Sequence, residues 1–116
     1  MKTVTIKEKS GITLIDVFSV DPKNQDKLVQ IMVEATEKTL KHIPGFISMS
    51  VHKSLDGKRV TNYEQWESVK HCEMMYQNPE VRQHIQKAVE IAKADITSLS
   101  SVLYTVEHVN GGDGKD

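Results

Sequence analysis

Apolar and polar residues follow two different spacings along this chain. Four stretches rich in β-branched residues predict strands, at 12–20, 46–54, 59–67 and 97–108. Between them, apolar residues recur at i, i+3, i+4 and i+7, which is the spacing of one helix face. The first such face carries Leu28, Ile31, Met32 and Ala35, and the second carries Val81, Ile85, Ala88 and Ala92.

Capping residues set the expected limits of the helices. Asp21-Pro22 opens the first helix, because aspartate accepts a hydrogen bond from a free backbone N–H and proline suits the first helical position. Ile43-Pro44-Gly45 ends it. Ser68 caps a short helix that runs through Gln77, and Asn78-Pro79 begins a further segment that runs to about Asp95.

The resulting order is strand, helix, strand, strand, broken helix, strand. This is the βαββαβ arrangement of a ferredoxin-like α+β fold, in which right-handed crossovers place both helices on one face of a four-stranded antiparallel sheet. The length fits one domain, which we expect to span residues 1–110. The glycine-rich stretch 111–116 is expected to be a disordered tail.

The second face of the sheet is predicted to be apolar as well. On the first strand Ile12, Leu14 and Phe18 point one way and Ile15 and Val17 the other. On the second strand Phe46 points to one face, and Ile47, Met49 and Val51 point to the other. In a half-exposed antiparallel sheet, apolar and polar residues alternate more regularly along each strand. We therefore expect a second copy of the chain to cover this face in a homodimer.

The Leu55-Asp56-Gly57 turn joins the two central strands, and its length decides which side chains share a face. A three-residue loop with Gly57 at positive φ pairs Ser54 with Lys58. It places His52 on the same face as Asn62, Glu64 and Trp66. A two-residue Asp-Gly loop shifts the register by one and moves His52 to the opposite face. We expect the first register.

Composition excludes several classes of function. Fifteen Lys and Arg balance sixteen Asp and Glu without a basic stripe, which argues against a nucleic-acid partner. No apolar run approaches the length of a membrane span, and the first ten residues lack the apolar core of a signal peptide. The single cysteine, Cys72, forms no internal disulfide and has no histidine at useful spacing, so we interpret it as a small core residue. The expected location is the cytoplasm.

Asn62 and Trp66 are the strongest candidates for a site. Four residues is an even step along a strand, so they share a face in either register. An asparagine in mid-strand is unfavourable, and leaving its amide buried and unpaired costs about 1–3 kcal/mol. The amide either reaches a turn or water at the end of the sheet or meets a ligand between sheet and helices, with the indole of Trp66 beside it.

Residues 13–88 resemble the antibiotic biosynthesis monooxygenase family. The resemblance rests on Asp21-Pro22, Pro44-Gly45-Phe46, Ser54-Leu55-Asp56-Gly57 and above all Asn62-Tyr63-Glu64-Gln65-Trp66. It implies a dimeric α/β barrel that oxidises quinol, naphthol or anthrone-like substrates with dioxygen and needs no metal, flavin or heme. It also implies catalytic roles for Asn62, Trp66 and His52.

Further residues are expected to contact the substrate, namely Phe18, Met75, Tyr76 and His84. Two alternatives stay open. Heme-degrading relatives of the same fold ligate iron through a histidine near the position of His84, although a lone histidine on an apolar face is more often a packed core residue. The second alternative is a dimeric protein that binds a small molecule without turnover, since a fold alone does not confer activity.

Overall fold

The computed structural model describes residues 2–92 and 99–113 of the chain. Its elements follow the predicted βαββαβ order with a broken second helix, so the ferredoxin-like fold class is confirmed. No helix among these residues is long and apolar enough to cross a membrane. The elements are β1 (Ile12–Ser19), α1 (Gln25–Lys38), β2 (Phe46–Lys53), β3 (Arg59–Trp66), α2 (Val69–Gln77), α3 (Pro79–Ile91) and β4 (Leu99–Tyr104).

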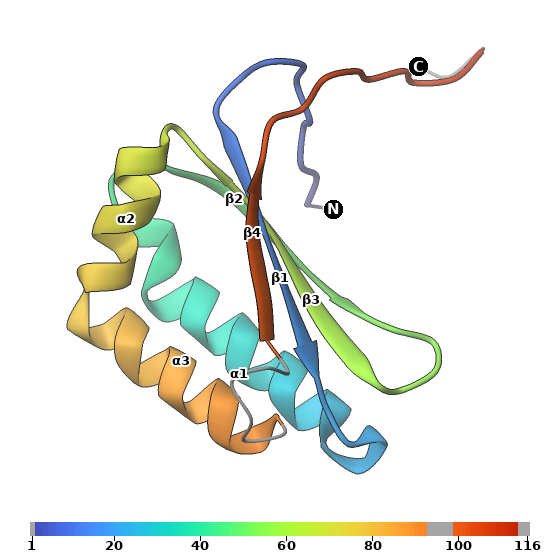
Figure 1. Ribbon diagram of the computed structural model, residues 1–116, viewed down its shortest axis with the longest axis vertical. Coiled ribbons are helices and arrows are strands. Elements are labelled where there is room, and N and C mark those ends of the chain that lie inside the picture. The colour runs from blue at the N-terminus through green and yellow to red at the C-terminus, as the bar shows by residue number, and fades with distance from the viewer. Residues whose placement is uncertain (1, 93–98, 114–116) are drawn as a thin grey trace.

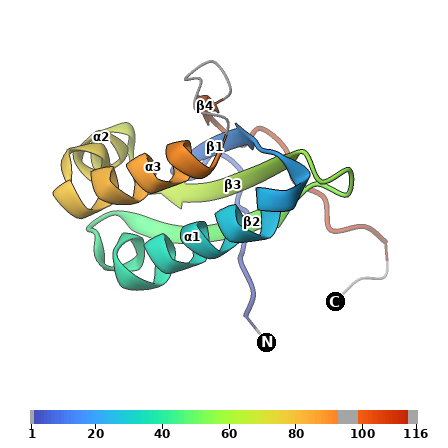
Figure 2. The same ribbon diagram turned by 90° about the horizontal axis from the view of Figure 1, so that it is seen from below.

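The four strands form one antiparallel sheet in the order β2-β3-β1-β4. The three helices lie together on one side of this sheet, and the described parts of the two terminal segments lie on the other side (Figure 1). The view from below shows that α1 and α3 run beside each other on the same side of the sheet (Figure 2). One face of the sheet is therefore covered by helices, while the other has no covering layer within the chain.

The capping signals are confirmed where the structure describes them. The Asp21 carboxylate accepts from the backbone N–H of Lys23 at 3.1 Å and starts a 3-10 turn that leads into α1. The Ser68 hydroxyl accepts from His71 N–H, and Asn78 accepts from the N–H groups of Glu80 and Val81. Helix α1 ends at Lys38, before the predicted stop, and a 3-10 turn fills residues 40–42. The predicted helix end at Asp95, strand start at Thr97 and last residues of the tail lie outside the described residues.

The register of the central hairpin differs from our expectation. Gly57 has positive φ (+80°) as predicted, but His52 pairs with Thr61 and Val51 pairs with Asn62. Four residues separate Ser54 from Arg59, whose carbonyl accepts from Ser54 N–H at 3.1 Å. The register is thus that of the alternative two-residue loop. A β-bulge near Ile47 then returns Phe46 to its predicted position opposite Trp66.

Side-chain hydrogen bonds explain why this loop is favoured. The Ser54 hydroxyl accepts from Arg59 N–H at 2.9 Å, and the Asp56 carboxylate accepts from Lys58 N–H at 3.0 Å. The buried amide of Gln25, at the start of α1, donates to the carbonyls of Ser54 and Arg59. Helix α1 therefore holds the base of the hairpin.

The corrected register changes both faces of the sheet. Met49 and Val51 face the helices, whereas they were expected on the outer face. The outer face still carries half-buried Ile15 and Val17 on β1 and exposed Val102 and Tyr104 on β4. It is less apolar than the sequence indicated, because serines and His52 occupy the outward positions of β2.

Two hydrophobic clusters fill the space between the sheet and the helices. The first gathers Phe18, Val20, Leu28, Met32, Val60, Ala88 and Ala92. The second gathers Leu14, Leu40, Trp66, Cys72, Met75 and Val81. Leu28, Val60, Trp66 and Ala88 are completely shielded from solvent. Polar side chains separate the two clusters, and these form the candidate site.

Candidate active site

A row of polar side chains crosses the helix-covered face of the sheet between the two clusters. Asp16 on β1 lies directly opposite Asn62 on β3 and opposite Ser101 on β4. Glu64 lies two residues beyond Asn62, on the same face. Asn62 and Glu64 are each 3% exposed, so neither is hydrated at the surface.

These residues line a small cavity of about 40 Å³ beneath the helices. Both clusters contribute to its walls. The lining consists of Asp16, Phe18, Met32, Ala35, Leu40, Asn62, Glu64, Met75, Tyr76, Val81, His84 and Ile85. Five of the seven predicted site residues therefore meet at one place: Asn62, Phe18, Met75, Tyr76 and His84.

The Asn62 amide is only half satisfied. Its nitrogen donates to the Met32 sulfur at 2.9 Å. Its carbonyl oxygen Oδ1 is buried and has no hydrogen-bond partner. A buried acceptor without a donor is destabilising, so it marks a position where a donor is expected to bind.

Half-buried Asp16 and buried Glu64 form a carboxyl pair beside this amide. Burial and the nearby charge of Asp16 raise the pKa of Glu64 from its usual 4.5 to about 8, so Glu64 is protonated at neutral pH. It donates a hydrogen bond to Asp16. Burial also raises the pKa of Asp16, while the hydrogen bonds from Ser101 and Glu64 lower it. The pair thus holds one proton and one negative charge.

Trp66 supports the pair and does not line the cavity. Its indole N–H donates to Glu64 Oε1 at 2.9 Å, and its ring contacts Phe46 edge-on with ring centres 5.5 Å apart. The side chain is fully buried in the second cluster. The sequence placed an indole beside a bound ligand, whereas the geometry connects Trp66 to the site through Glu64.

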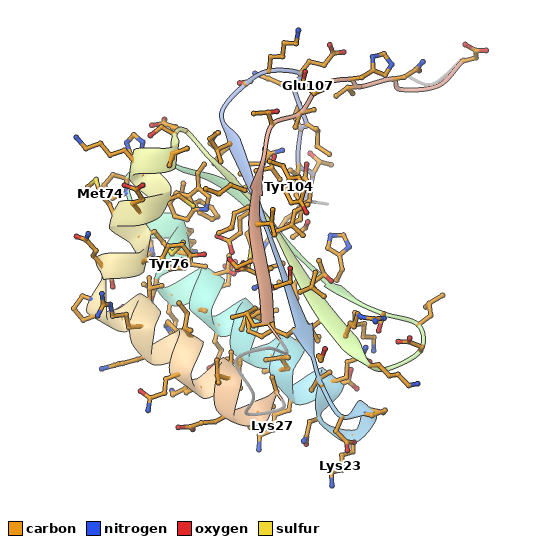
Figure 3. The ribbon with its side chains drawn as sticks, in the orientation of Figure 1. Lys23, Lys27, Met74, Tyr76, Tyr104 and Glu107 are labelled. Atoms are coloured by element: carbon orange, nitrogen blue, oxygen red, sulfur yellow. The ribbon has the colours of Figure 1, made fainter. Side chains whose placement is uncertain are left out.

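Tyr76 lines the cavity from α2 and is hydrogen-bonded to Ser101 on the edge strand β4. Figure 3 shows Tyr76 on the sheet side of α2 and Met74 on its outer side. The Ser101 hydroxyl donates to Asp16 Oδ1 at 2.5 Å. Since that hydroxyl has a single proton, the Tyr76 hydroxyl, 3.1 Å away, is the donor to Ser101. Burial raises the pKa of the Tyr76 phenol, with the charge of Asp16 adding to the effect.

His84 is held from the helix side. The Thr39 hydroxyl donates to Glu80 at 2.8 Å, so it must accept from His84 Nε2, 3.1 Å away. That nitrogen therefore carries a proton and is already bonded within the protein. Among the described residues, no group of three or more His, Cys, Asp or Glu side chains is placed to hold a metal ion.

His52 does not belong to this site, which corrects our expectation. It lies on the opposite face of the sheet, is exposed, and pairs its Nε2 with the Ser50 hydroxyl at 2.8 Å. The interpretation of Cys72 as a core residue is confirmed, since it is a free, buried cysteine. Burial is the main cause that raises the pKa of its thiol to about 12.

Sequence reasoning missed Asp16, Ser101 and the role of Glu64. A signal for the two acids was present, because Asp16 lies between the inward residues Leu14 and Phe18 and Glu64 lies between Asn62 and Trp66. An acidic residue in the middle of a buried alternation needs a partner. Ser101 carried no such signal, because β4 is mostly exposed.

Comparison with known proteins identifies the family of this chain. The family model described as antibiotic biosynthesis monooxygenase matches residues 11–87, which include the cavity residues of β1, β3 and α2. The chain belongs to the antibiotic biosynthesis monooxygenase family. The predicted family and the prediction of a monooxygenase are thereby confirmed.

Individual relatives support the assignment. The tetracenomycin-F1 monooxygenase of Streptomyces glaucescens is 36% identical over 81 residues, which are 70% of this chain and 72% of that protein. A monooxygenase from the gene ActVA-Orf6 of Streptomyces coelicolor, crystallised with nanaomycin D, is 25% identical with a TM-score of 0.79. That match covers 90% of this chain and 95% of that one. The cofactor-independent oxygenase SnoaB of Streptomyces nogalater shares the fold, with a TM-score of 0.68 at 13% identity over 87% of this chain and 97% of that one.

Proposed function

We propose that this protein oxidises a hydroxyaromatic compound with dioxygen in the cavity beside Asn62, without a metal, flavin or heme. The observation that carries the proposal is the buried Asn62 carbonyl oxygen that lacks a donor. A substrate hydroxyl supplies that donor. The relative crystallised with nanaomycin D and the relative that acts as a tetracenomycin-F1 monooxygenase support an aromatic substrate.

The electron balance of such a reaction requires no external reductant. In an anthrone-like substrate, converting the CH₂ group of the central ring, or its enol tautomer, to a carbonyl group with O₂ places one oxygen atom on carbon. The two hydrogens leave in water. The substrate carbon gives up the four electrons that reduce O₂, so the protein has to bind, orient and ionise the substrate.

The cavity residues are suited to these tasks. Asn62 Oδ1 fixes one substrate hydroxyl by accepting its hydrogen bond. Phe18 and Met75 supply apolar walls that exclude water from the reacting carbon, and thioethers pack well against rings. Tyr76 and His84 border the same space from α2 and α3.

Oxygen uptake with 1,8-dihydroxyanthrone tests the proposal, after subtraction of the uncatalysed rate. Wild-type protein should accelerate uptake without added metal or flavin. Asn62→Ala should lower turnover by about 100-fold or more, because it removes a positioned polar group. Gln30→Ala, which removes an exposed amide from α1, is the matched control and should behave as wild type.

Other outcomes would favour the alternatives. Ligand binding without oxygen consumption across naphthols, quinols and anthrones would indicate a binding protein. A Soret band on hemin addition that is lost in His84→Ala would indicate heme binding. The structure does not favour heme binding, since His84 Nε2 is already bonded to Thr39.

We further propose a homodimer in which the outer face of the sheet packs against a second copy. Its support is the apolar side chains that this face leaves uncovered, Ile15, Val17, Val102 and Tyr104. Light scattering should give twice the chain mass of 13.1 kDa. Val102→Glu on β4 should favour the monomer, whereas Val33→Glu on the outer side of α1 should not. The two valines are 42% and 39% exposed, so the changes are matched. A wild-type monomer would contradict this proposal.

A further inference from the structure

We propose that Asp16 and Glu64 act as one unit that accepts the proton from the substrate hydroxyl before the substrate reacts with dioxygen. This inference rests on the proposed function and names the base that the reaction needs. A neutral hydroxyaromatic reduces O₂ poorly, while its anion does so readily. Ionisation inside a dry cavity needs an acceptor within the protein.

The position of the pair supports this role. Both side chains line the cavity, and Asp16 lies directly across the sheet from Asn62, whose free Oδ1 is expected to hold the substrate hydroxyl. A hydroxyl bound beside Asn62 is next to the pair, and its one proton turns from Asn62 Oδ1 toward Asp16 when the substrate ionises. Because Asn62 is 3% exposed and unpartnered at Oδ1, the pocket is built to receive a polar group.

The hydrogen bonds around the pair assign its negative charge to Asp16. Ser101 donates to Asp16, Glu64 donates to Asp16, and Trp66 donates to Glu64. All three donors point toward the carboxyl groups. Asp16 therefore receives two hydrogen bonds that keep the negative charge on it, while Glu64 remains neutral. Asp16 is consequently the member of the pair that is free to accept a proton.

Three further titratable groups lie around the pair, and two are poor bases. Cys72 and Tyr76, both on α2, have raised pKa values and stay protonated at neutral pH. His84 on α3 lines the cavity and donates its Nε2 proton to Thr39. The cavity residues from α1, Met32 and Ala35, have no ionisable group. The histidine is consequently the competing base, and the test must separate it from the pair.

The proton transfer balances in charge and atoms. The substrate O–H bond breaks, an O–H bond forms on Asp16, and the charge of the pair changes from −1 to 0 as the substrate becomes an anion. The proton returns to the reduced oxygen when water forms. Ser101 joins Asp16 to the exposed side of β4, so it offers a path for exchange with solvent.

The decisive variant is the double change Asp16→Asn with Glu64→Gln, which keeps size and hydrogen bonding but removes both proton acceptors. We expect turnover with 1,8-dihydroxyanthrone to fall by about 100-fold or more. The residual rate should rise about tenfold per pH unit below the substrate pKa, because only substrate ionised in water then reacts. The single change Glu64→Gln imitates the protonated form of Glu64. Its turnover should stay within about tenfold of the wild-type value.

Two controls complete the experiment. Asp26→Asn with Glu73→Gln makes the same two kinds of substitution at exposed carboxyl groups and should leave turnover unchanged. His84→Gln keeps a donor for Thr39 but removes the ring base. If turnover falls about 100-fold in His84→Gln but not in the double carboxyl variant, the histidine is the base and the inference is wrong.

The remaining outcomes distinguish this inference from the proposed function. An inactive wild type would overturn the proposed function. If the wild type is active and the folded double variant turns over substrate within threefold of the wild-type rate, only this inference is overturned. If the double variant does not fold, the infrared absorption of a buried protonated carboxyl group still tests the pair. That band should disappear in Glu64→Gln, and its persistence would contradict a proton on Glu64.

Discussion

The two hydrophobic clusters and the polar row between them are built on the same strands but obey different rules. In the clusters, residues such as Leu28 and Trp66 are fully buried and their polar atoms, where present, are bonded. In the polar row, Asn62 Oδ1 has no partner and two carboxyl groups share one proton. The clusters stabilise the fold, whereas the row is left partly unsatisfied, as is common where a protein binds and transforms a ligand.

Truncation of a cluster residue should give the largest loss of stability. Leu28→Ala removes a completely buried side chain from the first cluster and should lower the free energy of unfolding by about 2–5 kcal/mol. Val33→Ala, on the exposed side of the same helix, should change it by about 0.5 kcal/mol or less. Urea denaturation measures both. Equal effects would mean that the cluster is not packed as described.

The carboxyl pair should make stability depend on pH. Because the pKa of Glu64 rises from 4.5 when unfolded to about 8 when folded, the native state holds a proton that the unfolded chain has released between these values. Its contribution to stability is therefore complete below pH 4.5 and declines as the pH rises toward 8. The difference between wild type and Glu64→Gln, followed by denaturation from pH 4.5 to 8, isolates this effect. A pH-independent difference would contradict it.

Two asparagines should respond in opposite ways to the same change. Asn62→Leu removes an unsatisfied buried carbonyl and should raise stability by about 1 kcal/mol while turnover is lost. Asn78→Leu removes the cap that accepts from Glu80 and Val81 and should lower stability by about 1 kcal/mol. Thermal unfolding without ligand compares them. A destabilised Asn62→Leu would contradict the view that the Asn62 carbonyl oxygen is unsatisfied in the absence of ligand.

The smallest effect is expected at His52. Because it is exposed on the outer face, His52→Ala should change stability by about 0.5 kcal/mol or less and leave turnover near that of wild type. The same oxygen-uptake assay used for Asn62→Ala measures it. A loss comparable with that of Asn62→Ala would mean that this histidine reaches the site after all.

Local signals in the sequence predicted the elements, and long-range contacts decided the details. Ser68 and Asn78 cap their helices as expected, because capping depends on residues two or three positions away. The position of His52 depends on the hairpin loop, which the distant Gln25 helps to fix through Ser54 and Arg59. The sequence contains that glutamine but gives no sign that it contacts the hairpin.

In the candidate site, too, local signals predicted some residues, whereas long-range contacts decided the roles of others. Asn62 was predicted because a mid-strand amide is unfavourable without a purpose, and it does line the cavity. The role of Trp66 was not predictable, since whether its N–H meets a ligand or Glu64 depends on rotamers. Asp16 could have been found from the alternation of β1, but its pairing with Glu64 required the alignment of β1 with β3.

The small size of the cavity determines how a substrate must bind. A volume of about 150 Å³ accommodates benzene, and this cavity has about 40 Å³. A fused-ring ligand of the proposed class therefore binds only after the cavity has widened, in a minor population of the molecules. The apparent affinity equals the intrinsic affinity reduced by the fraction of open molecules. The free energy needed to widen the cavity thus also determines what concentration of substrate fills it.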